Sequence, residues 1–386
     1  MLSYRSLKKV EMKTFYQMNH YAFALHKGKK DFTNDDYWKI IGGVKGLFDN
    51  EKLKTSYILY DFKCRLRDKW FRTGGIGNVV SPPENRRQGY TGKLLSYAIS
   101  EMKEKGMALS ALWPFSYAFY RKYGWEQING YRKYILSPEQ LAFADENSLG
   151  SFKKVGPDKW EQLNYIYHAA YQKYDLEIAR DKEWWQERIL KDNQKNKYAY
   201  FWEKDGRAKG YIIYSVKNIS NNQWEREMVV DEMLAVDFEA YIQLLRFLYY
   251  HDSQIKQINI SAPEDDPLIK IIPNPRIKNN YVPGVMFRII DLKKLLNSLD
   301  YPDLKIRITM KVMDSQASWN NGNFILEAEN GNGNINKIDE NSDTDITIGI
   351  NHLAMIITGF ITASEAKKLN IIKSKNKDKI RGLDRL

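Results

Sequence analysis

Residues 75–106 read GIGNVVSPPENRRQGYTGKLLSYAISEMKEKG. The apolar segment Ile76–Ser81 suits a strand, which the pair Pro82-Pro83 would end because proline cannot donate to a β-ladder. After the turn that follows, apolar residues recur at positions 94, 95, 98, 99 and 102, a spacing typical of one helical face, and Gly106 suits the helix end. The stretch therefore predicts a strand, a turn and a helix in immediate succession.

The predicted turn, Arg86–Gly92, combines two arginines with two glycines. Successive backbone N–H groups at such a turn form an anion-binding concavity, and the dipole of the following helix adds partial positive charge. Gly89 and Gly92 would let the backbone approach a ligand closely, and Arg86 and Arg87 would offset phosphate charge. The turn suits a pyrophosphate, although it has neither GxxxxGK[ST] nor GxGxxG. The alternative is a charged helix start at the surface.

The next segment, residues 107–125, reads MALSALWPFSYAFYRKYGW. It predicts an apolar strand ended by Pro114 and a short helix ended by Gly124, with a further strand after it. Most of the chain's 26 tyrosines are expected to serve packing. Tyr120 is singled out by position alone, because it lies on the element that follows the strand expected beside Ile76–Ser81.

Length and composition set the limits for the rest of the chain. At 386 residues it exceeds what one core usually organises, so two or three domains are expected. A content of 43% apolar and 28% charged residues is typical of a globular protein. The net charge of +12 favours an anionic partner, such as nucleic acid, a membrane surface or a phosphorylated cofactor, and does not choose among them.

Several classes of protein are disfavoured. The single cysteine, Cys64, excludes an intramolecular disulfide and a thiolate zinc site, and the five histidines are scattered, so no metal site is expected. The longest apolar run, Leu353–Ile361, is too short to cross a bilayer, and the N-terminus lacks the apolar core of a signal peptide. No nucleic-acid-binding motif accompanies the basic charge. A cytoplasmic protein that neither crosses a membrane nor binds nucleic acid is expected.

Strand-like and helix-like segments alternate throughout, which predicts an α/β (α+β) architecture. The polar stretch 144–150 is typical of a connecting loop, and a further block begins near Met286. The expected domains are residues 1–148, 149–285 and 286–386.

The turn and the tyrosine segment together resemble the GCN5-related N-acetyltransferase (GNAT) superfamily. Its members bind acetyl-coenzyme A at a turn of the pattern R/Q-x-x-G-x-G/A, and many carry a catalytic tyrosine in an FY-x-K-x-G-F/W segment. Phe119–Trp125 matches the second pattern, and Thr91 stands at the last glycine position of the first, a substitution that the pattern tolerates.

Further landmarks make the chain similar to the Enhanced intracellular survival (Eis) family of multidomain acetyltransferases. They are Leu59–Asp61, Gly74–Ile76, Pro83–Gly89, Asp265–Leu268, Met286–Asp291 and Asp345–Ile372. This resemblance covers nearly the whole chain. It implies a catalytic GNAT domain, a degenerate second copy of that fold, a C-terminal sterol-carrier-protein-like domain and a homo-oligomer, often a hexamer.

The resemblance also implies acetyl-coenzyme A as co-substrate and Tyr120 as general acid. The implied cofactor contacts are Val79, Val80, Ser81, Arg87, Gln88, Gly89, Tyr90, Thr91, Gly92, Phe115 and Ser116. The acceptor would be a small-molecule or peptide amine, and aminoglycoside-like antibiotics, polyamines and lysine side chains all fit. A cationic acceptor would favour acidic pocket walls, for which Asp35, Asp36 and Glu126 are candidates.

Direct attack by a neutral amine requires a base, donors for the developing oxyanion and an acid for the thiolate. Backbone N–H groups near Val79–Ser81 could serve the oxyanion, since a strand that ends early leaves donors unpaired. A tyrosine, with a reference pKa of about 10, stays protonated at neutral pH and can donate to the thiolate. In the family the terminal carboxylate is the base. This sequence stops at Leu386 without an aromatic tail, so either another base or a longer tail is expected.

Two alternatives stand beside an acetyltransferase. One is a non-catalytic protein that binds acyl-coenzyme A or lipid, against which Tyr120 and the phosphate-binding turn argue. The other is nucleic-acid binding, which only the net charge supports.

Overall fold

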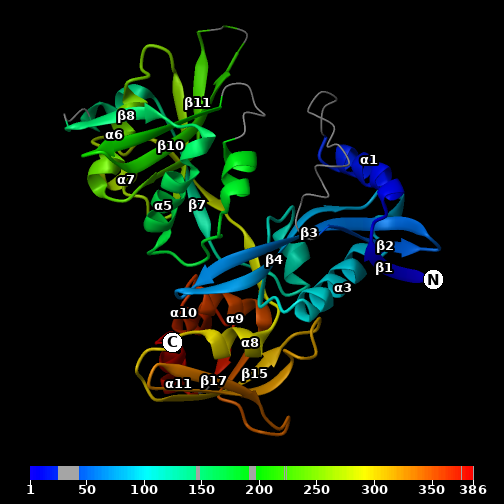
Figure 1. Cartoon of the computed structure of the whole chain (residues 1–386). Coiled ribbons are helices and arrows are strands. Elements are labelled where there is room, and N and C mark those ends of the chain that lie inside the picture. Colours follow the sequence, from blue (N-terminus) through cyan, green and yellow to red (C-terminus); the bar gives the residue numbers. More distant parts are fainter. Residues whose placement is uncertain are drawn as a thin grey trace. The chain divides into compact units, whose positions relative to one another are not determined.

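The computed structural model describes residues 1–24, 43–144, 148–190, 197–220, 222, 224–374 and 376–385 (Figure 1). Their strands form three sheets, two of seven strands and one of five. The chain divides into two compact units, Met1–Asn129 with Val285–Leu386 and Gly130–Gly284. Both units combine sheets with helices, which confirms the predicted α/β (α+β) class.

The first sheet has the strand order β1-β2-β3-β4-β5-β14-β6. Its strands are β1 (Leu2–Ser6), β2 (Val44–Asp49), β3 (Lys52–Leu66), β4 (Lys69–Val80), β5 (Leu109–Leu112), β6 (Glu126–Gln127) and β14 (Met286–Ile289). Its helices are α1 (Met12–Ala22), α3 (Tyr90–Glu104) and α4 (Tyr117–Arg121), with 3₁₀ turns η1 (Lys9–Glu11) and η2 (Pro83–Asn85). Neighbouring strands are antiparallel except β4 and β5, which run parallel. The predicted strand, turn and helix are thus the end of β4, residues 81–89 and α3.

Helices α1 and α3 lie on opposite faces of this sheet (Figure 1). The five residues of the predicted apolar stripe on α3 are fully buried and pack in one layer with Ile76 and Tyr120. On the other face, Phe15 of α1 packs in one layer with Val80. Strand β4 therefore supports both layers, and its C-terminal end is fixed between them. Cys64 is a buried free thiol.

Two strands lie in a different sheet from the one that their place among the expected domains implies. Strand β14 lies between β5 and β6 of the first sheet, antiparallel to both. Strand β7 (Gly130–Leu136) lies in the second sheet, between β12 and β13. Because Tyr134 and Leu136 are buried in the second core, the first unit breaks at Asn129, earlier than the boundary expected at residue 148. The three-domain division stays a prediction.

The second sheet has the order β13-β7-β12-β11-β10-β9-β8. Its other strands are β8 (Gly150–Lys154), β9 (Lys197–Lys204), β10 (Arg207–Asn218), β11 (Arg226–Ala235), β12 (Gln257–Pro263) and β13 (Lys278–Pro283). Its helices are α5 (Trp160–Tyr171), α6 (Phe238–Tyr249) and α7 (Leu268–Ile271), with η3 (Pro138–Ala144), η4 (Pro157–Lys159) and the π-helical η5 (Trp184–Ile189). As in the first sheet, a parallel pair, β11 and β12, is joined through a helix. This repetition of order matches the expected second copy of the fold.

The third sheet has the order β17-β16-β15-β18-β19 and belongs to the first unit. Its strands are β15 (Ile306–Met313), β16 (Gly322–Glu329), β17 (Asn332–Lys337), β18 (Ile346–Gly349) and β19 (Lys373–Ser374). Its helices are α8 (Leu292–Ser298), α9 (Ile350–Ile357), α10 (Ala363–Lys368) and α11 (Lys377–Asp384). Within the described ranges, no helix is long and apolar enough to span a membrane.

Candidate active site

The two parallel strands of the first sheet separate at their C-terminal ends. Strand β4 pairs with β5 from Thr73 to Ile76, whose partner Leu112 ends β5, whereas β4 continues to Val80. The predicted residues Val79 and Val80 lie on this extension. Backbone donors on the β5 side of the extension are therefore available to a ligand, as a thioester oxygen requires.

The same extension contains a β-bulge that the sequence analysis missed. On the β3 side, Gly77 pairs with Ile58 and Val80 pairs with Ser56, so Asn78 and Val79 together face the single residue between these partners. Asn78 has a φ of +51°, in the left-handed region. The signal for it was Gly77-Asn78 inside an apolar run, since asparagine tolerates this region better than most residues. The bulge changes which way the strand's next N–H group points.

The predicted phosphate-binding turn, Arg86–Gly92, spans the last residues before α3 and the first three residues of that helix, which begins at Tyr90. Arg87 and Gly89 both have left-handed backbones, with φ of +60° and +79°, and Gly89 caps α3. The Ser81 and Thr91 hydroxyls lie 3.0 Å apart and join the strand end to the helix start, while the Gln88 amide donates to the Glu84 carbonyl at 2.7 Å. A Cβ at Gly89 would have no atom within 4 Å. The turn is exposed and open above Gly89, as anion binding requires.

Two further residues of this segment contact the protein itself. The Tyr90 hydroxyl donates to Asp49 Oδ2 at 3.1 Å, and Lys54 Nζ lies 5.6 Å from the Tyr90 ring centre. A Cβ at Gly92 would overlap the Tyr123 hydroxyl, so this glycine is needed for packing against Tyr123. Its predicted role in close approach of a ligand stays a prediction. The contact also brings the start of α3 against the residues that follow α4.

Tyr120 lies on α4, which the Ser116 side chain caps by accepting from Phe119 N at 3.4 Å. Its ring meets those of Phe115, Phe119 and Trp125 edge to face. Only 3% of Tyr120 is exposed, and burial raises the pKa of its hydroxyl above the usual value. Among the described residues, no hydrogen bond reaches that hydroxyl. Phe115, by contrast, is 73% exposed.

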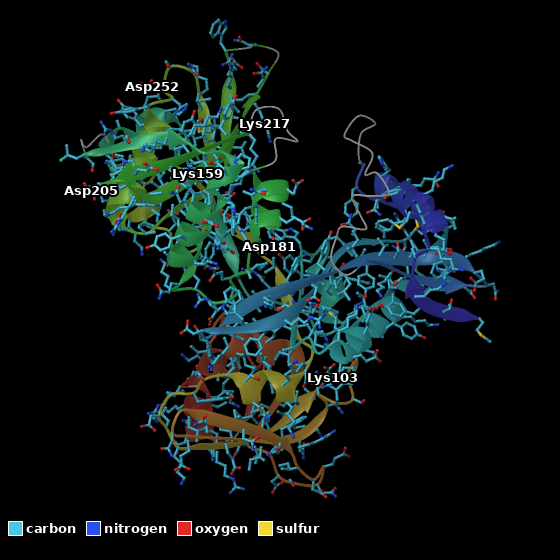
Figure 2. The ribbon with its side chains drawn as sticks, in the orientation of Figure 1. Lys103, Lys159, Asp181, Asp205, Lys217 and Asp252 are labelled. Atoms are coloured by element: carbon cyan, nitrogen blue, oxygen red, sulfur yellow. The ribbon has the colours of Figure 1, made fainter. Side chains whose placement is uncertain are left out.

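The structure thus brings three of the predicted site residues together in one layer, whereas Val80 faces the opposite layer. Val79, Tyr90 and Tyr120 pack in the same apolar cluster, although they come from a strand, the start of α3 and α4. Helix α3 is fixed at its other end too, where Lys103 (Figure 2) donates to Asp291, the cap of α8. The site is therefore built on elements held at both ends.

The proposed acidic walls are not supported at the one position that can be placed. Glu126 is buried, and its carboxylate accepts from Arg121 Nε at 2.7 Å and from Asn351 Nδ2 at 3.2 Å. It is an internal ion-pair partner, which sequence could not reveal because Asn351 comes from a distant segment. Asp35, Asp36 and Leu386 lie outside the described residues.

The second unit lacks an equivalent phosphate-binding turn. Only Val236 and Asp237 separate β11 from α6. The Asp237 carboxylate accepts from Ala240 N at 2.8 Å and pairs with Lys209 at 3.2 Å. A protein carboxylate thus occupies the helix N-terminus, where it would repel a phosphate. The Asp237 carboxylate at the start of α6 therefore explains why this second copy of the fold is not suited to bind a phosphate there.

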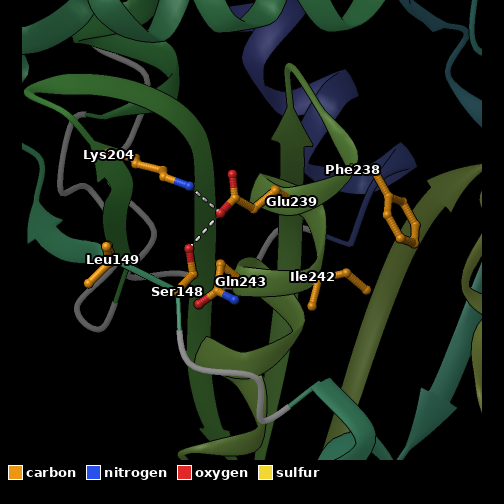
Figure 3. Close-up of a pocket in the computed structure, with 7 residues that line it drawn as sticks. All are labelled: Ser148, Leu149, Lys204, Phe238, Glu239, Ile242 and Gln243. Carbon is orange, nitrogen blue, oxygen red and sulfur yellow. Dashed lines mark hydrogen bonds and ion pairs between the residues drawn. The ribbon is translucent and has the colours of Figure 1, made fainter.

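A surface pocket of about 460 Å³ adjoins that same helix (Figure 3). Its lining includes Glu239, which accepts from both Lys204 and Ser148 at 2.6 Å. None of the predicted site residues lines it. In the described parts of the chain, no group of three or more His, Cys, Asp or Glu side chains could hold a metal ion.

Comparison with known families gives three matches along the chain. Residues 3–128 match an acetyltransferase (GNAT) domain, and residues 176–289 match a second acetyltransferase (GNAT) domain family. Residues 292–386 match the sterol carrier protein domain.

The chain is also similar to whole proteins. An uncharacterized N-acetyltransferase of Streptomyces griseus is 22% identical over 311 residues, covering 74% of this chain and 71% of that protein. A probable N-acyltransferase from Enterococcus faecalis has a similar structure, with a TM-score of 0.90, 20% identity and coverage of 100% and 97%. Eis1 from Mycobacterium abscessus gives a TM-score of 0.80, 18% identity and coverage of 100% and 96%. At such identities the structural likeness establishes the fold alone.

Proposed function

Because the chain belongs to the GNAT acetyltransferases, with two GNAT domains and a sterol carrier protein domain, we propose that its first domain transfers acetyl from acetyl-coenzyme A to an amine. The observation that carries the proposal is the open strand end between β4 and β5, followed directly by the left-handed turn at Arg87 and Gly89. The second domain lacks such a turn. We therefore assign cofactor binding to the first domain alone.

In this proposal the cofactor's pyrophosphate lies on the backbone N–H groups of residues 87–92, beside exposed arginines. The thioester lies along the β4 extension, where Val79, Val80 and Ser81 supply backbone groups. Phe115 and Ser116 approach from the β5 side. This arrangement suits an acyl-coenzyme A, since it pairs an anion site with donors for a carbonyl oxygen.

The reaction is proposed as direct attack. The neutral amine nitrogen forms a bond to the thioester carbon, the carbon–sulfur bond breaks, and its electron pair leaves on sulfur. The Tyr120 hydroxyl gives its proton to that thiolate, and the ammonium proton passes to a base or to water. Support for Tyr120 comes from burial, which keeps the phenol protonated, and from its hydroxyl having no hydrogen bond among the described residues.

The acceptor is proposed as a small-molecule or peptide amine. Aminoglycoside-like antibiotics, polyamines and lysine side chains all carry the amine nitrogen that direct attack needs. Each of the three classes is therefore tested as an acceptor. A homo-oligomer, a hexamer by family resemblance, and a cytoplasmic location also stay predictions.

The proposal is tested by mixing the purified full chain with acetyl-coenzyme A and each amine class, and measuring the free thiol released. We expect thiol release that depends on one of the amines and yields its acetylated product. If acetyl-coenzyme A binds but no amine in a broad panel accelerates thiol release, the alternative of a non-catalytic acyl-coenzyme A binder would replace this one.

A further inference from the structure

The bulge in β4 is tied to α1, which lies on the opposite face of the sheet from α3. Helix α1 also meets the cofactor-binding turn, where the Arg86 guanidinium lies 5.5 Å from the centre of the Tyr21 ring. Asn78 Nδ2 donates to Asn19 Oδ1 of α1 at 2.8 Å. Asn19 is only 1% exposed, and its own amide donates to the Phe15 carbonyl one turn earlier at 2.9 Å. The Asn19 amide is therefore fixed in orientation before it meets the bulge. No part of the proposed chemistry uses this residue.

A second anchor lies on the other side of Val79. The Thr55 hydroxyl, fully buried on β3, donates to the Val80 carbonyl at 3.0 Å. Asn78 and Val80 are thus each hydrogen-bonded to a buried side chain, so the residues on both sides of Val79 are fixed. The two anchors come from different elements, so the fold fixes the bulge independently of the β-ladder.

The geometry of the peptide explains why this matters. The N–H group of Val79 belongs to the peptide that joins residues 78 and 79, so the backbone torsion of Asn78 sets its direction. The left-handed backbone conformation that Asn78 adopts is sparsely populated for residues other than glycine. It persists only where the surrounding structure holds it. Asn19 holds the side chain of that residue.

We propose that Asn19 is a positioning residue for the thioester, because it fixes the left-handed Asn78 and thereby aims the backbone N–H of Val79 at the thioester oxygen. The inference rests on the proposed function and deepens it. Asn19 touches no substrate atom in this proposal and acts only through Asn78. Its removal should therefore affect the acetyl group and leave the coenzyme's anionic part unaffected.

The test compares wild type with Asn19→Ala and Asn78→Gly in the full chain. Glycine keeps the left-handed backbone without strain but loses the contact, so one variant stays informative if the other does not fold. Isotope-edited infrared difference spectra of bound acetyl-coenzyme A, labelled with ¹³C at the carbonyl, report hydrogen bonding to that oxygen. Asn259→Ala is the matched control, since Asn259 is also buried and its amide donates to Glu227 at 2.6 Å.

We expect the carbonyl band to lie below its solution frequency in wild type and in Asn259→Ala, and to move back toward it in both bulge variants. With an acceptor, kcat should fall about tenfold in those variants. This is less than the roughly hundredfold loss expected when an oxyanion donor is removed altogether, because the Val79 N–H group is still present and only its direction changes. The dissociation constant of free coenzyme A should stay within about twofold, because the phosphate-binding turn is intact.

The outcomes separate this inference from the proposed function. A shifted band in wild type that is unchanged in folded Asn19→Ala and Asn78→Gly overturns the role of Asn19 and leaves the acetyltransferase assignment standing. A bound cofactor with no band shift in wild type also overturns it. Failure of wild type to bind acetyl-coenzyme A would overturn both.

Discussion

At the scale of single residues, the Tyr120 hydroxyl combines burial with the absence of a hydrogen bond from any described residue. Burial disfavours the phenolate and raises the pKa, so the group stays protonated beyond the usual tyrosine value of about 10. We expect the pH profile of kcat to show no decline from loss of this acid below about pH 10. A decline with a midpoint near pH 8 that disappears in Tyr120→Phe would contradict this expectation.

Replacing Tyr120 by phenylalanine removes one hydroxyl and keeps the ring contacts with its aromatic neighbours. We expect kcat to fall about 10²–10⁴-fold, the usual contribution of a positioned acid, with acetyl-coenzyme A affinity retained. Steady-state kinetics and a binding titration measure the two effects separately. A change confined to KM would indicate uniform binding and remove the acid role.

Gly89 offers a second prediction at this scale. Gly89→Val strains a left-handed backbone and places a branched side chain over the concavity, so acetyl-coenzyme A affinity should fall at least tenfold. Gly206→Val is the matched control, because Gly206 has a φ of +71° and equally open surroundings, in the second unit. Calorimetric titration should show normal affinity for the control. Equal affinity in both folded variants would rule out the turn as the pyrophosphate site.

Sequence could single out the turn and Tyr120 as candidates because each lies in a local pattern of glycine, arginine or aromatic residues. It could not identify Asn19 and Thr55, since their roles depend on contacts between segments far apart in the chain. Gly92 shows the converse case. Its predicted role was close approach of a ligand, and the fold adds a contact with the Tyr123 side chain that sequence could not show.

At the scale of elements, the segment that follows α4 is hydrogen-bonded to a buried ion pair. Arg288 of β14 is fully buried, donates to the Tyr123 carbonyl at 2.7 Å, and pairs with both oxygens of Asp314 at 2.7 and 2.8 Å. A Cβ at Gly124 would overlap this guanidinium, so the predicted helix-ending glycine has a packing role as well as its φ of +86°. The segment that carries Tyr120 thus rests on β14.

Removing one partner of that pair should be costly. Asp314→Ala leaves Arg288 buried and uncompensated, and we expect the free energy of unfolding to fall by about 3–5 kcal/mol. Adding Arg288→Met should restore part of the loss, because no buried charge remains. Glu329→Ala is the control, since its pair with Lys305 is exposed and should contribute no more than about 1 kcal/mol. Denaturant titrations that give equal losses for Asp314→Ala and Glu329→Ala would contradict this prediction.

At the scale of the whole molecule, one cavity in the sterol-carrier-like part is too small for a lipid. The cavity found among Leu296, Met310, Leu326 and Leu353 is about 20 Å³, enough for about one water molecule. We expect the full chain to show no saturable binding of a fluorescent sterol or fatty-acyl probe. Displacement of such a probe by unlabelled lipid at stoichiometric concentration would show instead that this part opens to bind it.

Alternating patterns and the family resemblance predicted the class of fold and its three successive kinds of domain. They did not predict that β14 joins the first sheet from a distant segment or that β7 belongs to the second sheet, because apolar alternation shows that a strand exists and not which strands it pairs with. The first boundary was therefore expected later than Asn129. Strand pairing is a property of long-range packing, and only the fold contains it.

The position of β14 also has a consequence for synthesis on the ribosome. A chain that has emerged only as far as residue 284 contains β5 and β6, but not the strand that lies between them. Until Ile289 emerges, β5 presents an unpaired edge, which is a template for association with other chains. The half that holds Tyr120 is made first and completed late, so a nascent chain would depend on chaperones during that interval.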